Sequence, residues 1–487
     1  MKLESIIQNS SAGKVFYFFE KISEIPRGSK KEKAISDWLV AFAKEKKLVV
    51  VQDKYLNVLI RKPATSGYEN FSPLIIQGHM DMVWEKNKDV NFDFETQGID
   101  LIINDGFITA NGTTLGADNG VAVAVALALL DSDNISHPEL EILITSDEEA
   151  GMSGAENFNT SLLKGCTMLN VDTDEEKTIY VSSAGGARVQ IDLDFSRDKN
   201  HENSMDVILE VKGLNGGHSG ADIDKNLGNS IKILSKILAS LSIPFKIYDI
   251  TGGEKMNAIP RESTAVLNIN ADSFDKIKKE ISSEFEKIKE NYAKTEEKLT
   301  YEFGPVTDVQ MSPITDSDSK KIIEFLNELP NGIIAMSKDI KGLVEASLSL
   351  GVLRTNETSI SMQFLLRSSF NKSVDIMLEN LKVLSKKYGA KFHTDSSYNS
   401  WEYNENSELR ELFIKSQTAL TGTAPEIKAV HAGLECGILA GKMKKLDVIS
   451  IGPNNYGAHT PEERLEIKSM EYLWQWILKS LELYDFK

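Results

Sequence analysis

The sequence predicts an α/β protein with a mostly parallel, doubly wound sheet and helices on both faces. Two observations predict this class. Short apolar runs of strand length alternate with helical segments near both ends of the chain, which is typical of parallel sheets. The middle of the chain instead combines alternating strands with amphipathic helices, which favours an inserted α+β domain. At 487 residues, the chain is also too long for a single core.

The first part of the chain carries the elements of the parallel sheet. Apolar residues at helical spacing predict helices over 15–25 and 31–46, and alternation predicts extended chain over 49–60. The buried strands are predicted from four apolar runs, which are Pro73 to Ile76, Leu140 to Thr145, Thr167 to Val171 and Leu446 to Ile451. Asn119 to Leu130 is small and apolar all round, so we expect a helix buried against the sheet.

The inserted region is predicted to span residues 187–397. Two successive rounds of alternating strands and amphipathic helices fill it, which predicts an inserted lid domain of two ferredoxin-like units. After residue 398 the chain returns to helix–strand alternation and ends in a predicted helix over 469–483. The simplest partition is therefore a discontinuous domain of residues 1–186 and 398–487 that is interrupted by the 187–397 insert.

Charge and composition exclude several classes of protein. The chain has 72 acidic and 55 basic residues, a net charge of −17, which argues against binding to nucleic acid or to an anionic membrane. The longest apolar stretch, Val121 to Leu130, is too short to span a bilayer. Only two cysteines occur, and no signal peptide is evident at the start of the sequence. We therefore expect a cytoplasmic protein with reduced thiols.

Polar side chains follow each apolar run at its C-terminal end. They are His79 and Asp81 after the first run, Asp118 at the start of the buried helix, Glu148 and Glu149 after the second run, Asp172 after the third and His459 after the fourth. In open α/β sheets this edge is where ligands bind. Segments far apart in the sequence are therefore expected to bring histidine and carboxylate side chains to one edge.

Each of these residues has an ordinary structural alternative when it is taken alone. Asp118 could cap the helix, and Glu148 with Glu149 could form a solvated turn. Carboxylates crowded at one edge would repel each other, however, so a cation is the natural reason for them. Two histidines and three carboxylates suit zinc, cobalt or manganese better than calcium. Five ligands are too many for one tetrahedral zinc, but they suit two metals that share a carboxylate and a bridging water.

Several motifs make the pattern specific. The segments 78–83 (GHMDMV), 116–120 (GADNG), 145–151 (TSDEEAG) and 170–172 (NVD) resemble the co-catalytic zinc metallopeptidases. The segments 216–220 (GGHSG), 256–261 (MNAIPR) and 431–437 (HAGLECG) look most like the aminoacyl-histidine dipeptidases of that family, also called cytosolic nonspecific or Xaa-His dipeptidases. The resemblance covers nearly the whole chain, and it implies a metal-dependent dipeptidase.

The resemblance also implies how two divalent metal ions would be bound. His79 and Asp172 would bind one metal, Glu149 and His459 would bind the other, and Asp118 would bridge them. Zinc is the expected metal, with cobalt or manganese as alternatives.

Three further residues acquire catalytic roles from the resemblance. Asp81 would orient His79, Glu148 would act as the general base on the bridging water, and His218 of the insert would donate a hydrogen bond to the oxyanion. The alternative for His218 is a turn histidine in a Gly-rich loop. In resembling proteins with single-unit lids this histidine comes from a partner subunit, so a homodimer and a within-chain role both stay open. The other histidines are expected in surface or packing roles or are undecided, namely His137, His201, His393 and His431.

The substrate contacts are expected at Asn257, Arg367 and Glu435. An arginine can bind a terminal carboxylate bidentately, and Glu435 could contact an α-amino group. Relatives with shorter lids end the strand after the Asn-x-Ile-Pro motif in arginine, whereas this chain has Asn-Ile-Asn at 268–270. Arg367, on the corresponding strand of the second α+β round, is therefore the expected replacement, with a structural salt bridge as the alternative.

The expected function is hydrolysis of dipeptides of the Xaa-His type with broad specificity. An N-acyl amino acid deacylase or a glutamate-type carboxypeptidase would use the same residues on another amide. A metal-binding protein that has lost catalysis is the non-enzymatic alternative, and the intact Glu148 argues against it.

Overall fold

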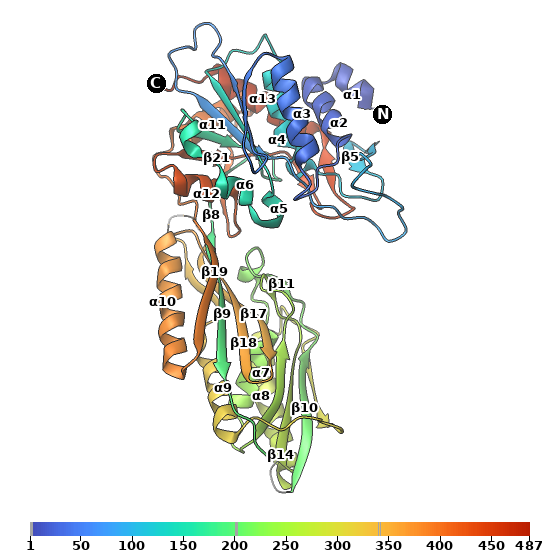
Figure 1. The fold of residues 1–487 in the computed structure, drawn as a ribbon, viewed down its shortest axis with the longest axis vertical. Coiled ribbons are helices and arrows are strands. Elements are labelled where there is room, and N and C mark those ends of the chain that lie inside the picture. Colours follow the sequence, from blue (N-terminus) through green and yellow to red (C-terminus); the bar gives the residue numbers. More distant parts are fainter. Residues whose placement is uncertain (1–2, 200–202, 339, 341) are drawn as a thin grey trace. The chain divides into compact units, whose positions relative to one another are not determined.

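The protein, analysed as a computed structural model, is described over residues 3–199, 203–338, 340 and 342–487. It divides into two compact units, and each is described by itself (Figure 1). Unit 1 comprises Met1–Ser182, Tyr403–Ala429 and Leu434–Lys487, and unit 2 comprises Ser183–Glu402 and Val430–Gly433. Within the described ranges, no helix is both long enough and apolar enough to cross a membrane.

An eight-stranded sheet forms the centre of unit 1, in the order β1-β2-β6-β3-β7-β21-β8-β20. Its strands are β1 (Val49–Gln52), β2 (Val58–Lys62), β3 (Leu74–His79), β6 (Leu140–Thr145), β7 (Thr167–Asn170), β8 (Thr178–Ser183), β20 (Glu426–Val430) and β21 (Asp447–Ser450). The four central strands, β6, β3, β7 and β21, run parallel. Every residue of β3, β6 and β7 is buried, which explains why these strands are apolar runs rather than alternating ones.

Unit 1 also contains helices, some of which contact this sheet directly. They are α1 (Leu3–Asn9), α2 (Gly13–Ser23), α3 (Lys33–Glu45), α4 (Ala117–Leu130), α5 (Glu148–Gly151), α6 (Ser153–Asn157), α11 (Glu408–Thr421), α12 (Glu435–Lys442) and α13 (Ile467–Glu482). Helix α4 packs between β3 and α2, and almost all of its side chains are buried. That position explains its uniformly small, apolar sequence, because both of its sides face other elements.

A second, four-stranded sheet in unit 1 supports the segment around His459. Its order is β22-β23-β5-β4, with β4 (Leu101–Asn104), β5 (Phe107–Ala110), β22 (Asn455–Tyr456) and β23 (Arg464–Glu466). His459 lies in the connection between β22 and β23, and β23 in turn pairs with β5. The last predicted metal ligand is therefore carried by a hairpin rather than by the end of a strand of the large sheet.

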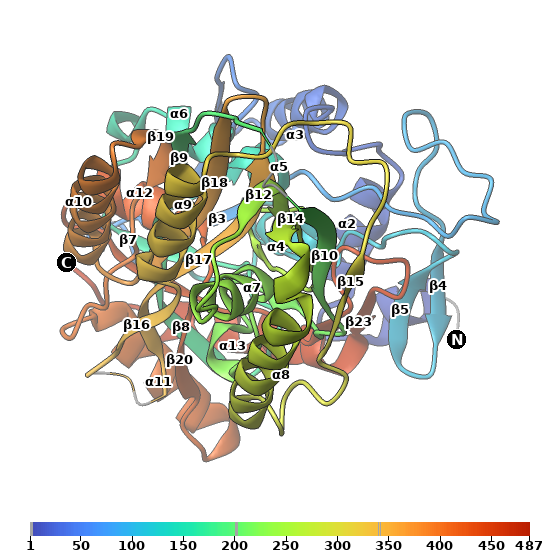
Figure 2. The ribbon, with the colours of Figure 1, turned by 90° about the horizontal axis from the view of Figure 1, so that it is seen from below.

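Unit 2 is built on a nine-stranded antiparallel sheet with four main helices along it (Figure 2). The strands are β9 (Gly185–Asp194), β10 (Ser204–Lys212), β12 (Lys246–Gly252), β14 (Ser263–Asn270), β15 (Thr300–Pro305), β16 (Gly332–Met336), β17 (Val344–Thr355), β18 (Ser359–Ser368) and β19 (Lys391–Tyr398). The helices are α7 (Ser230–Ala239), α8 (Phe274–Asn291), α9 (Asp316–Glu328) and α10 (Asn371–Tyr388). One apolar core joins the helices to the sheet.

The α/β class predicted from the sequence is confirmed. The parallel strands are the central four, and the outer strands β1, β2 and β8 run antiparallel to their neighbours, so the sheet is mixed. In unit 2 the strands of both α+β rounds join in one sheet, where Gly252 of β12 pairs with Leu353 of β17. The division of the insert into two ferredoxin-like units stays a prediction.

Candidate active site

Three buried strands of unit 1 deliver polar residues to one edge of the sheet. Strand β3 ends on His79, and α5 begins at Glu148, three residues after the end of β6. Strand β7 ends two residues before Asp172. Because β3, β6 and β7 are parallel neighbours, their carboxyl ends meet at the same edge.

Asp118 lies between two imidazole rings. Its Oδ1 is 3.1 Å from Nε2 of His79, and its Oδ2 is 3.1 Å from Nε2 of His459. The N-cap position of α4 is occupied by Gly116, and not by Asp118. From the sequence alone, Asp118 could also have capped the helix. In the structure, each of its carboxylate oxygens instead contacts a different histidine.

The other predicted ligands complete two groups around Asp118. Nε2 of His79 is 3.5 Å from Oδ1 of Asp172, and Nε2 of His459 is 2.9 Å from Oε2 of Glu149. Within each group, His79–Asp118–Asp172 and Asp118–Glu149–His459, the candidate ligand atoms lie within 4.8 Å of one another. The structure therefore brings together all five residues in the two predicted sets, and Asp118 belongs to both.

The donor chemistry of these groups fits a pair of divalent metal ions. Imidazole nitrogens and carboxylate oxygens are the ligands that zinc and its neighbours in the first transition row accept. Oε1 of Glu149 is buried and has no hydrogen-bond partner among the described residues. A buried carboxylate oxygen without a partner is costly, and a bound cation would satisfy it.

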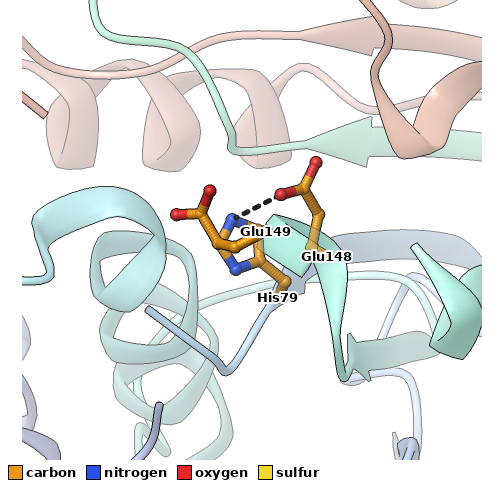
Figure 3. A group of neighbouring side chains, drawn as sticks. All are labelled: His79, Glu148 and Glu149. Carbon is orange, nitrogen blue, oxygen red and sulfur yellow. Dashed lines mark ion pairs between the residues drawn. The ribbon is translucent and has the colours of Figure 1, made fainter. Parts of the chain in front are cut away.

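Glu148 belongs to a third group, with His79 and Glu149, whose candidate ligand atoms also lie within 4.8 Å of one another. Its Oε2 is 3.9 Å from Nε2 of His79, and Figure 3 shows the carboxylates of Glu148 and Glu149 near the His79 ring. Burial raises the pKa of the Glu148 carboxyl well above its usual value, and the nearby charge of Asp172 adds to the shift. A carboxyl group whose pKa is raised in this way is suited to accept and return a proton near neutral pH.

Carboxylates and imidazoles in this cluster shift one another's pKa values. Hydrogen bonds to Asp118 and Glu149 raise the pKa of His459 to about 11. Burial opposes protonation of His79, but the charge of Asp172 and the hydrogen bond with Asp118 outweigh it and raise the pKa of His79 as well. The cluster therefore attracts cations, and protons occupy the imidazoles when no metal does.

Asp81 ties His79 to the segment that carries the two glutamates. Its carboxylate lies 3.4 Å from Nδ1 of His79 and accepts hydrogen bonds from the backbone N–H groups of Glu148 and Glu149 and from the Ser29 hydroxyl. The contact with Nδ1 leaves Nε2 of His79 facing Asp118 and Asp172. Nδ1 of His79 also lies 3.1 Å from the backbone carbonyl oxygen of Asp81, and the role of the Asp81 carboxylate in orienting His79 stays a prediction.

In unit 2, His218 lies against Arg367. The backbone N–H groups of Gly220 and Ala221 donate to Nδ1 of His218, at 3.3 and 3.0 Å, so the ring proton belongs on Nε2. Nε2 is 3.4 Å from Nη2 of Arg367, and because both nitrogens carry protons in this tautomer, the contact is not a hydrogen bond. Burial, followed by the charge of Arg367, lowers the pKa of His218. The ring is therefore neutral and presents an N–H donor beside a guanidinium group.

Arg367 itself is buried and has no acidic partner in the described part of the chain. It lies on β18, donates to the Tyr398 hydroxyl at 3.3 Å, and its Nε has no hydrogen-bond partner among the described residues. No salt bridge to Arg367 occurs in the described part of the chain, so the structural salt bridge offered as an alternative is absent there. His431, whose Nε2 is 2.7 Å from Oγ of Ser347, adds no positive charge beside Arg367, because burial and Arg367 lower its pKa to about 4.

The two remaining predicted substrate contacts differ in exposure. Asn257 is exposed in unit 2, and its backbone carbonyl accepts a hydrogen bond from Ser219, next to His218. Glu435 of unit 1 is completely buried, and its Oε2 accepts hydrogen bonds of 2.6 Å from Gln77 and from Thr145. Contact of either residue with a substrate stays a prediction.

The other histidines lie away from these clusters or outside the described residues. His137 is buried with its ring against the Pro138 carbonyl, and His393 is exposed on β19. His201 lies outside the described residues.

Sequence reasoning gave no role to two buried charged residues that reach the site, Arg27 and Glu463. Arg27 donates to the backbone carbonyls of Met80 and Asp81, and Glu463 accepts from the backbone N–H of Asp118. A signal existed for both. Arg27 follows Pro26 directly after the helix predicted over 15–25, and Glu463 follows His459 by only four residues.

Comparison with known families decides the class of the protein. The model of peptidase family M20/M25/M40 matches residues 75–482, which is most of the chain. The chain belongs to peptidase family M20/M25/M40. The resemblance found in the sequence motifs is confirmed, and with it the prediction that this M20/M25/M40 protein is a hydrolase.

Individual relatives of this M20/M25/M40 chain are similar along their whole length. The cytosol non-specific dipeptidase of Escherichia coli (strain K12) is 37% identical over 466 residues, which cover 95% of this chain and 96% of the relative. The crystal structure of the aminoacylhistidine dipeptidase from Vibrio alginolyticus superposes with a TM-score of 0.92 at 34% identity and covers 99% of this chain and 98% of that one. The aminopeptidase PepT from Bacillus cereus, at 15% identity and a TM-score of 0.56, shares the fold.

Proposed function

We infer that the protein is a metal-dependent dipeptidase that uses two divalent metal ions, zinc first among the candidates. The observation that carries this function is the position of Asp118, whose two carboxylate oxygens each lie 3.1 Å from a different histidine. His79 and Asp172 would bind one ion with Asp118, and Glu149 and His459 would bind the other. The full-length similarity to dipeptidases from two bacteria supports the substrate class.

Glu148 is the proposed general base. The metal pair, when bound, acidifies a water molecule and polarises the peptide carbonyl. Glu148 takes the proton of that water, which then attacks the scissile carbonyl, and it returns the proton to the leaving amine. Its buried position beside Asp172, which raises the pKa of its carboxyl, suits both halves of this transfer.

His218 and Arg367 are the proposed contacts for the oxygen atoms of the substrate. The N–H on Nε2 of His218 is a neutral donor suited to an oxyanion. The Arg367 guanidinium, buried and without an acidic partner among the described residues, is suited to the terminal carboxylate of a dipeptide. Asn257 is exposed, and its backbone carbonyl accepts a hydrogen bond from the N–H of Ser219, next to His218. Glu435 is buried beside the ligand strands, and we retain it as a candidate for the amino end of the substrate.

A substrate panel on metal-stripped protein tests the function. Zinc, cobalt or manganese is added back, and the rates are compared for dipeptides that include β-alanyl-histidine, for acetyl-amino acids and for peptides with C-terminal glutamate. We expect dipeptides to be hydrolysed fastest and several sequences to be accepted. Preference for acetyl-amino acids would instead assign a deacylase, and metal binding without hydrolysis of any substrate would assign a binding protein.

The proposed setting is the cytoplasm, in agreement with the name of the E. coli relative and with the reduced state of Cys166 and Cys436. Small peptides are the proposed partners, and nucleic acid and membranes are not. Whether His218 serves its own chain or that of a partner in a homodimer is tested by activity at high dilution combined with gel filtration. We expect activity to survive dissociation, since the insert carries two α+β rounds.

A further inference from the structure

Four consecutive backbone N–H groups of unit 1 converge on one buried carboxylate. Leu115 and Gly116 donate to Oε2 of Glu463, both at 2.8 Å, and Ala117 and Asp118 donate to Oε1, at 2.9 and 3.3 Å. The Glu463 side chain is 2% exposed. These N–H groups precede the regular part of α4 and have no partner within the helix, so Glu463 satisfies donors that would otherwise be orphaned.

A buried arginine holds the same segment from the other side. Arg27, also 2% exposed, donates from Nη2 to the Gly116 carbonyl and from Nη1 to the carbonyls of Met80 and Asp81, at 3.1 and 3.3 Å. Arg27 therefore connects the Gly116 peptide to the residues that directly follow His79. Glu463 connects the same peptide to the hairpin that carries His459.

The backbone at this point leaves room for no side chain. Gly116 has a φ of 71°, and a Cβ atom there would lie 2.5 Å from Nη2 of Arg27. Glycine is thus required both by the left-handed conformation and by the close approach of the guanidinium. Three segments that are far apart in sequence, around His79, Asp118 and His459, are joined through this one peptide.

We propose that Arg27 and Glu463 are positioning residues that act as a clamp on residues 115–118 and hold Asp118 at equal distance from the two histidines. This inference rests on the proposed two-metal function. A bridging carboxylate must be fixed within a fraction of an ångström to serve two ions, and its own side chain cannot do so, because both of its oxygens are engaged by the imidazoles. Its backbone must therefore be held by other groups.

Metal binding tests the clamp separately from catalysis. In Glu463→Gln, the side chain keeps its size, but one carboxylate oxygen is replaced by an NH2 group, which cannot accept hydrogen bonds from the backbone N–H groups that it faces. Glu463→Asp keeps the negative charge but shortens the side chain. Arg27→Lys keeps the positive charge but loses the planar guanidinium group that donates hydrogen bonds to three backbone carbonyls. Glu462→Gln is the matched control, because Glu462 is exposed on the same loop and the substitution removes the same charge. Zinc or cobalt is titrated into each metal-free protein by calorimetry, and circular dichroism verifies folding.

The expected result is two tightly bound equivalents in the wild type and in E462Q. In E463Q, E463D and R27K we expect affinity for at least one equivalent to fall about 10- to 100-fold, the usual effect of losing a group that positions metal ligands. The absorption spectrum of the cobalt protein should change in the same three variants, which a purely structural role in folding would not cause.

Each other outcome is decisive. A folded clamp variant that binds both equivalents with wild-type affinity overturns the role of that residue, and E463D serves this purpose where E463Q does not fold. A wild type that binds fewer than two equivalents overturns the two-metal function, and the clamp with it. If metal affinity fell as much in E462Q as in E463Q, the loss would be due to the negative charge alone, and this result would also overturn the clamp.

Discussion

In unit 1, His79 and His459 lie among carboxylates, whereas in unit 2, His218 and His431 lie beside Arg367. The pKa shifts follow the neighbours. Asp172 and Asp118 raise the pKa of His79, and Asp118 and Glu149 raise that of His459. Burial and the arginine lower the pKa of His218 and of His431. The histidines of unit 1 therefore lie in surroundings that attract cations, whereas the histidines of unit 2 are kept neutral.

This difference shows how two kinds of histidine chemistry can be separated within one chain. A metal ligand profits from surrounding negative charge, which attracts the ion and is neutralised by it. A hydrogen-bond donor to an anion profits from a neutral ring with a fixed tautomer, next to a permanent positive charge. The charges support the proposal that unit 1 binds the metals and that unit 2 binds the substrate oxygens, and substitutions in each unit can test it.

The largest effect is expected from Glu148→Gln in unit 1. Because Glu148 belongs to the proton transfer and to neither metal group that shares Asp118, kcat should fall by about 10³- to 10⁴-fold while two metals stay bound. Steady-state kinetics and metal analysis measure the two properties. Glu156→Gln, an exposed residue on α6, is the control and should behave as the wild type. Retained turnover in the Glu148 variant would remove it from the mechanism.

In unit 2, His218→Ala should lower kcat by about 10²- to 10³-fold, the usual loss when an oxyanion donor is removed. Metal content should be unchanged, since the metal ligands belong to unit 1. Kinetics with a good dipeptide substrate checks this, and His393→Ala on the exposed side of β19 serves as the matched histidine control. A loss of metal in the His218 variant would contradict the separation of the two units.

A smaller effect is expected from Arg367→Met. Hydrogen bonds to charged groups contribute about 1.5–3 kcal/mol, so KM for a dipeptide should rise about 10- to 100-fold. The wild type should prefer a free dipeptide to its C-terminal amide, and the variant should lose that preference. If Arg367→Met preferred the free dipeptide to its C-terminal amide as strongly as the wild type does, Arg367 would not bind the substrate carboxylate.

Much of this comparison could be anticipated from the sequence. The apolar runs ending before His79, Glu148 and Asp172 locate the carboxyl edge of the sheet, because strands buried on both faces have a distinctive composition. For His459, the sequence pattern predicted only that it follows the fourth apolar run. It is carried by a hairpin of a small sheet whose strands β22 and β23 have two and three residues, too short for any periodicity to show.

Roles that depend on backbone contacts could not be predicted. Arg27 and Glu463 act on carbonyl and N–H groups, which every residue possesses, so no sequence pattern marks their partners. The tautomer of His218 likewise depends on the backbone of Gly220 and Ala221. Glu435 looked like a pocket residue in its motif, yet its carboxylate is buried against Gln77 and Thr145, which lie on strands remote from it in sequence.

The smallest effect concerns protons, and it distinguishes the two units most directly. Since the pKa of His459 is about 11 in the metal-free protein, its ring carries a proton at pH 7, and a metal must displace that proton to bind. Raising the pH therefore favours the metal, and the apparent Kd for zinc should fall about tenfold per pH unit for each proton released between pH 6 and 8. Calorimetry in two buffers of different ionisation enthalpy counts these protons.

On binding zinc, the His459→Asn variant should release fewer protons than the wild type. The His218→Asn variant should release the same number as the wild type, because His218 is already neutral. An equal change in both variants would mean that the histidines of the two units do not differ in the way their neighbours imply.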